Sequence, residues 1–186
     1  MARTKKVTCS DILDATERVV VKLGSARLSI DAVAKEAGIS KSRVVYDYKS
    51  KGALLEALID RQFQRGSEQI DTLVKECADT PHPELFARIK MSEQVPDDTE
   101  KAVAVAVSAS VSSEATLKRK MQDWFDHDLK AIDNPIKREA SYLAFFALVG
   151  FGCHEWLGLI NWESKERLSF LDSIRTMYSI YPDSQS

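Results

Sequence analysis

Two short amphipathic segments, joined by a turn of three to four residues, constrain the fold more than any other feature of this sequence. The first covers residues 30–36 and follows Ser29, and the second covers residues 41–48 and follows Ser40. Serine is a preferred N-cap of helices, and a glycine such as Gly38 commonly follows a helix end. The spacing therefore predicts a helix-turn-helix motif whose second helix presents its polar side to a groove.

The remaining sequence predicts an all-α chain of about nine helices, because apolar residues recur at three- and four-residue spacing. Seven Gly and five Pro in 186 residues supply too few turns for a β-sandwich or a barrel. Residues 102–111 alternate like a strand, but their alanine content and the acidic residues before them favour a helix. The expected helices are 10–23, 30–36, 41–48, 51–77, 84–92, 97–111, 114–132, 136–159 and 164–181.

Charge is distributed unevenly along the chain. Residues 1–50 carry ten Lys and Arg against six Asp and Glu, a net charge of +4, whereas the remainder carries −6. A basic N-terminal segment suits a polyanionic partner, although a difference of this size also arises by chance clustering. Charge alone therefore leaves the partner open.

Several classes of protein are disfavoured by the sequence. No apolar run is long enough to cross a bilayer, and the basic start leads into no apolar signal segment, so we expect a soluble, cytoplasmic protein without a membrane partner. Three cysteines without a CxxC pair indicate neither a disulfide framework nor a zinc site. Without a glycine-rich phosphate loop, an HExxH motif or a nucleophile elbow, we expect no enzymatic activity and no cofactor.

The segment of residues 29–58 resembles the N-terminal domain of TetR/AcrR-family transcriptional regulators. In that family a capped short helix is followed by A-G-[VI]-S, a recognition helix that ends in an aromatic residue, and S-K-x-x-L-L. The resemblance departs at Val45, where the family commonly has a phosphate-binding Tyr, and at Asp47, where it commonly has His. The matching residues are Ser29, Ile30, Val33, Ala34, Ala37, Gly38, Ile39, Ser40, Tyr48, Ser50, Lys51, Leu54 and Leu55.

The resemblance implies a DNA-binding regulator, and the residue types suggest individual contacts. Ser29 and Ser40 begin helices whose N-termini suit a phosphate, although each is equally a plain structural cap. Arg43 suits a bidentate contact to guanine O6 and N7, and a phosphate contact or a solvated side chain is as plausible. The predicted DNA-binding residues are Ser29, Ser40, Lys41, Ser42, Arg43, Tyr46, Tyr48 and Lys51. Arg3, Lys5 and Lys6 are read either as a solvated end or as an arm that follows the phosphates or enters the minor groove.

Residues 136–159 form the most apolar predicted helix, and its small residues allow a second helix to approach closely. Together with residues 164–181 it suits a twofold dimer interface, and the resemblance implies the same arrangement. A homodimer would hold its two N-terminal DNA-binding domains about 34–36 Å apart over a palindromic operator. A helix buried wholly inside its own subunit is the alternative. The predicted interface residues are Ala140, Ala144, Ala147, Phe151, Leu171 and Ile174.

The resemblance also implies a small-molecule effector, which the residues suggest is apolar or aromatic. The candidate ligand-binding residues are Phe86, Met91, Met121, Trp124, Phe125, Phe145 and Phe146, although aromatic residues at helical spacing are more often plain core. We expect a DNA-binding domain at residues 1–50 and a ligand-binding and dimerisation domain at residues 51–186. The main hypothesis is a ligand-released repressor, and the alternative is a TetR-like DNA-binding module that acts architecturally or through a protein partner.

Overall fold

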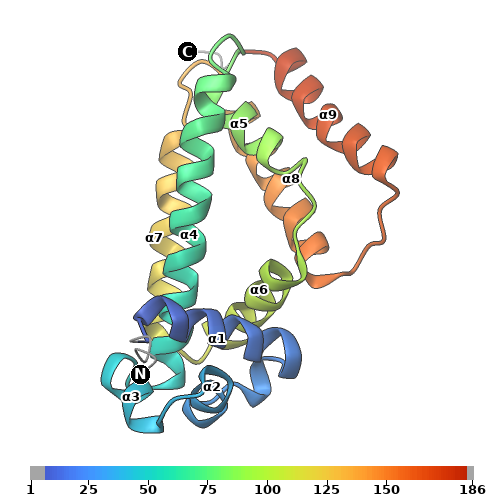
Figure 1. Cartoon of the computed structure of the whole chain (residues 1–186). Coiled ribbons are helices and arrows are strands. Elements are labelled where there is room, and N and C mark those ends of the chain that lie inside the picture. Colours follow the sequence, from blue (N-terminus) through green and yellow to red (C-terminus); the bar gives the residue numbers. More distant parts are fainter. Residues whose placement is uncertain (1–6, 184–186) are drawn as a thin grey trace. The chain divides into compact units, whose positions relative to one another are not determined.

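The computed structural model describes residues 7–183, and within that range the chain forms nine α-helices, one short 3₁₀ helix and no strand (Figure 1). The predicted all-α class is therefore confirmed for the described part of the chain. The 3₁₀ helix η1 covers Ser25–Arg27 and was not predicted. The α-helices are α1 Cys9–Leu23, α2 Ile30–Ala37, α3 Lys41–Asp47, α4 Lys51–Glu76, α5 Pro83–Met91, α6 Asp98–Val111, α7 Ala115–Ala131, α8 Arg138–Leu157 and α9 Ser164–Ile180.

The ends of α2 lie where the sequence places them because its capping chemistry is local. The Ser29 hydroxyl accepts the Ala32 N–H at 3.1 Å, so one of the free N–H groups of the first turn is satisfied. At the other end Gly38 adopts a left-handed conformation with φ of 66°, which a residue without Cβ tolerates. The Ile39 N–H then reaches back to the Ala34 carbonyl at 3.0 Å and closes the helix.

The alternating stretch of residues 102–111 is helical, as predicted. The Asp97 carboxylate accepts the Glu100 N–H at 2.8 Å, and the Glu100 carboxylate accepts the Asp97 N–H at the same distance. This reciprocal capping box fixes the start of α6. Val103, Ala106 and Val107 are buried at helical spacing, so one side of α6 faces a core.

The described residues form two compact units, and their boundary differs from the predicted division at residue 50. The first unit joins the chain up to Gln62 with Asp97–Arg119, and the second joins Phe63–Pro96 with the chain from Lys120 onward. In the first unit α6 packs against α1 and η1. The predicted division at residue 50 therefore separates two expected roles and does not coincide with the boundary between the compact units.

The core of the second unit lies among α5, α8 and α9. Five of the six predicted dimer contacts are buried in this core, where they meet other helices of the same chain, and the sixth, Ala147, is half-buried against it. Those side chains therefore pack against helices of their own chain, and their part in a dimer interface stays a prediction. The five are Ala140, Ala144, Phe151, Leu171 and Ile174.

A single arginine connects several segments of the second unit. Arg167 on α9 is only 4% exposed and donates to the Glu155 carboxylate at 2.5 and 2.9 Å. Its guanidinium also donates to the backbone carbonyls of Ser92, Glu93 and Gln94, which follow α5. One buried cation thus fixes the end of α8, the start of α9 and the loop after α5 to one another. In residues 7–183 no helix is both long and apolar enough to span a membrane.

Candidate nucleic-acid interface

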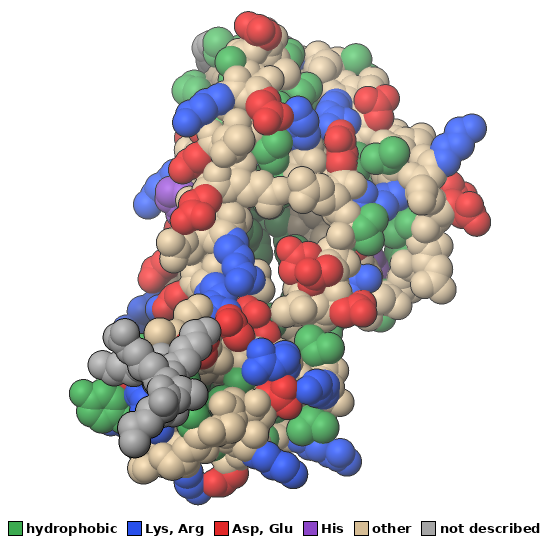
Figure 2. Space-filling view, viewed as in Figure 1, with side chains coloured by type: hydrophobic (Ala, Val, Ile, Leu, Met, Phe, Trp, Pro, Cys, Tyr) green, Lys and Arg blue, Asp and Glu red, His purple; other side chains and the backbone are tan. Residues whose placement is uncertain are grey.

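The helix-turn-helix is formed by α2 and α3, which pack against each other while α2 packs against α1. Val33 and Ala34 of α2 and Val44 of α3 are buried, so the apolar sides of both helices face inward. The Glu36 carboxylate accepts hydrogen bonds from Lys22 and Arg18 of α1, both at 2.8 Å, and these bonds lower the pKa of Glu36. The outward side of α3 remains polar. Figure 2 shows basic and acidic side chains interspersed over the surface.

The predicted serines are both N-caps with exposed side chains. Ser29 begins α2, and Ser40 begins α3 by accepting the Arg43 N–H at 3.2 Å. The Ser40 and Ser42 hydroxyls lie 3.0 Å apart, and Lys41 forms an exposed ion pair with Asp31 on α2 at 2.8 Å. Each capping oxygen is used as an acceptor, so its hydroxyl proton is the group suited to a phosphate oxygen.

Lys51 lies at the start of α4, as predicted, and is held by a local contact. Its ammonium donates to the Ser25 carbonyl of η1 at 2.7 Å, and the Ser50 hydroxyl caps α4 by accepting the Ala53 N–H at 3.1 Å. These bonds place a positive charge beside the N–H groups of the first turn, where the helix dipole favours an anion. The start of α4 therefore combines two features that attract phosphate.

Arg43 is half-buried and engaged with other groups of the first unit. Its Nη1 forms an ion pair with Asp47 one turn later, and its Nη2 donates to the Val7 carbonyl at 3.2 Å. The guanidinium carbon also lies 5.7 Å from the centre of the Tyr46 ring. This ion pair was not predicted, although an arginine and an aspartate four residues apart on a helix are a recognisable sequence signal.

The two predicted tyrosines of this region have different surroundings. Tyr46 is 75% exposed, and the Lys49 ammonium lies 5.9 Å from its ring centre. Tyr48 is half-buried at the C-cap of α3, where its N–H donates to the Val44 carbonyl, and burial raises the pKa of its phenol. Tyr48 is therefore packed more tightly than a freely exposed contact residue. The predicted arm of Arg3, Lys5 and Lys6 lies outside the described residues.

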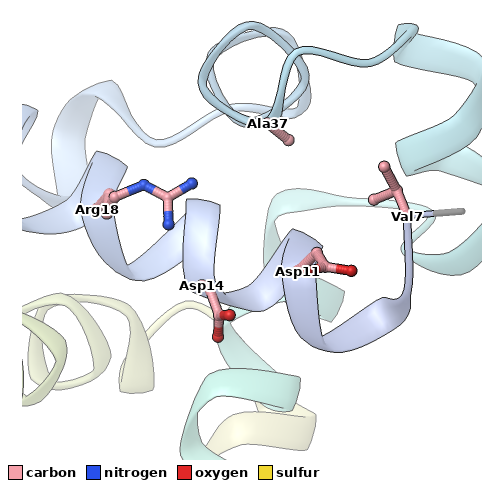
Figure 3. Close-up of a pocket in the computed structure, with 5 residues that line it drawn as sticks. All are labelled: Val7, Asp11, Asp14, Arg18 and Ala37. Atoms are coloured by element: carbon pink, nitrogen blue, oxygen red, sulfur yellow. The ribbon is translucent and has the colours of Figure 1, made fainter. Parts of the chain in front are cut away.

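A cavity of about 220 Å³ in the first unit is lined by acidic and basic side chains (Figure 3). Asp11 belongs to the capping box of α1, Asp14 pairs with Arg61 at 2.6 Å, and Arg18 pairs with Glu36. The lining residues thus serve the packing of the first unit. Among residues 7–183, no group of three or more His, Cys, Asp or Glu side chains is placed to hold a metal ion.

Three of the predicted ligand-binding residues, Phe86, Phe125 and Phe145, belong to the main core of the second unit. Trp124, Phe125, Phe145 and Phe146 form a continuous series of ring contacts, with centroids 5.3 to 6.4 Å apart. The series begins with Phe63, which stacks on Trp124 at 4.9 Å and was not among the predicted residues.

The other three predicted ligand-binding residues, Phe86, Met91 and Met121, are not part of this series of ring contacts. Met91 packs against Leu73, Cys77 and Ala87, and Phe86 contacts both this cluster and the Tyr178 ring. Met121 is half-buried. Within the ring series, Phe146 is the most exposed residue, at 56%. The structure therefore brings together four of the seven predicted residues through direct ring contacts.

Two short capped helices that meet at a glycine turn, with a polar outer side on the second, define a helix-turn-helix DNA-binding protein. Residues 12–58 match the model of the tetR family of bacterial regulatory proteins. The N-terminal part of the chain is therefore similar to the DNA-binding domain of tetR-family regulatory proteins. A comparison with curated proteins finds no significant match.

Solved structures share the fold over nearly the whole chain. A transcriptional regulator from Rhodococcus sp. Rha1 is 15% identical with a TM-score of 0.74, and the alignment covers 92% of this chain and 96% of that protein. A protein from Mesorhizobium loti described as a TetR-family transcriptional regulator is 15% identical with a TM-score of 0.72, covering 91% and 93%. The SmeT–triclosan complex is 18% identical with a TM-score of 0.68, covering 90% and 89%.

Proposed function

We propose that this chain is a homodimeric repressor that binds a palindromic DNA operator and is released when an apolar or aromatic small molecule binds its second unit. The helix-turn-helix geometry carries the proposal: α3 presents exposed polar side chains, and the helices before and after it, α2 and α4, begin at exposed serine caps. Such an arrangement suits base contacts from α3 and phosphate contacts from the flanking helix N-termini.

Exposed apolar side chains on α8 support the dimer. Leu143 and Phe146 are 50% and 56% exposed, and Gly150 lies further along with nothing within 4 Å of the position that a Cβ would occupy. Spacings of three and four residues put these positions on one side of the helix. Packing this side against a second copy removes apolar surface from water and allows close backbone approach. We place the dimer interface on this stripe, with Trp156 and Leu157 at its end.

The effector is supported by the aromatic series in the second unit and by the presence of triclosan in the structural neighbour SmeT. The alternative, a DNA-binding module without an effector, is favoured by the direct stacking of Phe63 on Trp124, since a ligand among these rings would have to separate them. The two candidates are separated by titrating the protein–operator complex with a panel of aromatic compounds that includes triclosan. Release of DNA supports the effector, and retention with every compound supports the alternative.

The operator is the first quantity to determine. Selection of bound fragments from random DNA with the purified full chain at physiological salt is expected to recover a palindrome whose half-sites lie about one helical turn apart, roughly 34–36 Å. Two helix-turn-helix motifs related by a twofold axis would produce that symmetry. Salt-sensitive binding without a recovered motif would contradict the repressor proposal and favour an architectural role.

The variant Lys51→Ala is expected to weaken binding to every DNA sequence by a similar factor. Its ammonium is proposed to contact phosphate rather than a base, so specificity is retained. The plot of log binding constant against log salt concentration should become shallower by about one unit per subunit. Lys130→Ala, which removes an exposed lysine of the second unit, is the matched control and should leave the slope unchanged. A change of base preference in Lys51→Ala would contradict the phosphate assignment.

A further inference from the structure

The outer side of α3 presents an aromatic ring flanked by two cations. Tyr46 is 75% exposed, and its ring centre lies 5.7 Å from the Arg43 guanidinium carbon and 5.9 Å from the Lys49 ammonium. Lys49 also donates to the Tyr46 carbonyl at 3.2 Å. Cations held near a ring restrict where that ring can lie, because the ring quadrupole attracts them. Tyr46 therefore projects from α3 with both cations near its ring.

Two of the five N–H donors of the Arg43 guanidinium are already used. Reading guanine requires two parallel N–H groups of the guanidinium to reach O6 and N7. Here Nη1 is paired with Asp47 and Nη2 with the Val7 carbonyl. The Asp47 side chain is only 12% exposed, so water competes weakly for its carboxylate. Both terminal nitrogens of Arg43 are therefore held by other groups of the first unit, and these two bonds fix the orientation of the guanidinium.

We propose that Asp47 is a positioning residue that holds Arg43 beside Tyr46, and that Tyr46 reads the 5-methyl group of a thymine in each operator half-site. The thymine methyl is the apolar group that the base edges present in the major groove, and a contact with an apolar side chain distinguishes it from the other bases. An exposed ring on the polar side of α3 matches that chemistry. This inference rests on the proposed operator binding and specifies what the operator contains.

Replacing thymine by uracil tests the methyl contact directly. Once the operator is selected with the full chain, each thymine of one half-site is changed in turn to uracil, which removes only the methyl group. One such change is expected to weaken wild-type binding about fourfold, the usual effect of one buried methyl. The same change should have less than about a twofold effect on Tyr46→Ala, because the contact partner is gone.

Asp47→Asn tests the positioning role, because it removes the charge that holds Arg43. Selection with this variant is expected to recover guanine at a half-site position where the wild type recovers thymine. Asp47→Asn combined with Arg43→Ala should lose that guanine preference. Asp79→Asn removes the same charge from an exposed turn of the second unit and is the matched control, expected to keep the thymine preference. Thermal unfolding of each variant verifies that it is folded.

The outcomes separate this inference from the function on which it rests. If the wild type selects no sequence, the proposed operator binding is wrong. If it selects an operator but no thymine methyl matters in a Tyr46-dependent way, operator binding stands and the thymine contact is overturned. If Asp47→Asn leaves the selected sequence unchanged, the positioning role of Asp47 is overturned.

Discussion

Replacing Arg167 with leucine is expected to lower the free energy of unfolding by about 3–5 kcal/mol, the usual loss when one partner of a buried ion pair is removed. The guanidinium is 4% exposed and satisfies the Glu155 carboxylate and the carbonyls of Ser92, Glu93 and Gln94. Leucine fills part of the space but leaves a carboxylate and three carbonyls without their donor. Chemical denaturation of the purified variant measures the loss.

Two companion variants define the cause of that loss. Arg138→Leu removes an exposed arginine, 61% accessible and paired with Asp133, and should leave the free energy of unfolding almost unchanged. Arg167→Leu combined with Glu155→Leu should recover part of the stability, because no unpaired charge is then buried. A loss below about 1 kcal/mol in Arg167→Leu would show that these hydrogen bonds form equally well with water in its place.

The variant Phe146→Glu is expected to convert the proposed dimer into monomers, with a rise in the dissociation constant of about 100-fold or more. The side chain is 56% exposed on the proposed contact stripe of α8, so a twofold interface would bring two carboxylates into an apolar contact. Because the proposed operator is bound by two connected helix-turn-helix motifs, DNA binding should weaken strongly as well. Sedimentation equilibrium measures the association, and a DNA titration measures the loss of binding.

Val95→Glu provides the control for this experiment. Val95 is 68% exposed in the loop between α5 and α6, so the substitution introduces the same charge outside α8 and α9. It should leave the dimer intact. A wild-type chain that sediments as a monomer at all concentrations would contradict the dimer itself, whereas an unchanged dimer in Phe146→Glu would remove this stripe from the interface.

The helix pattern was predictable because its determinants lie close together in the sequence. Ser29 caps a helix that begins at the next residue, Gly38 ends the same helix, and Pro83 opens α5. Each of these effects acts within one turn. The predicted helix boundaries differ from the observed ones by no more than two residues, and α1, for example, begins at Cys9 instead of Ser10.

Helical periodicity alone does not predict which helix packs against the apolar side of another helix. The small residues Ala140 and Ala144 indicate that a helix packs closely on α8, but the spacing does not reveal whether that helix belongs to the same chain. In the structure α5 and α9 supply the contact. Arg167 likewise reads as a charged position on a helix, because its acceptors at Ser92, Glu93 and Gln94 lie more than 70 residues away.

The packing of α6 on α1 limits which segments of this chain can be exchanged with those of another protein. The first unit is built from two stretches of chain, the second of which contributes buried Val103, Ala106 and Val107. A chimera that grafts only residues up to Gln62 onto a foreign body would leave the α6-facing side of α1 uncovered. Operator specificity is therefore exchanged more safely by point changes on α3 than by transplanting a contiguous segment.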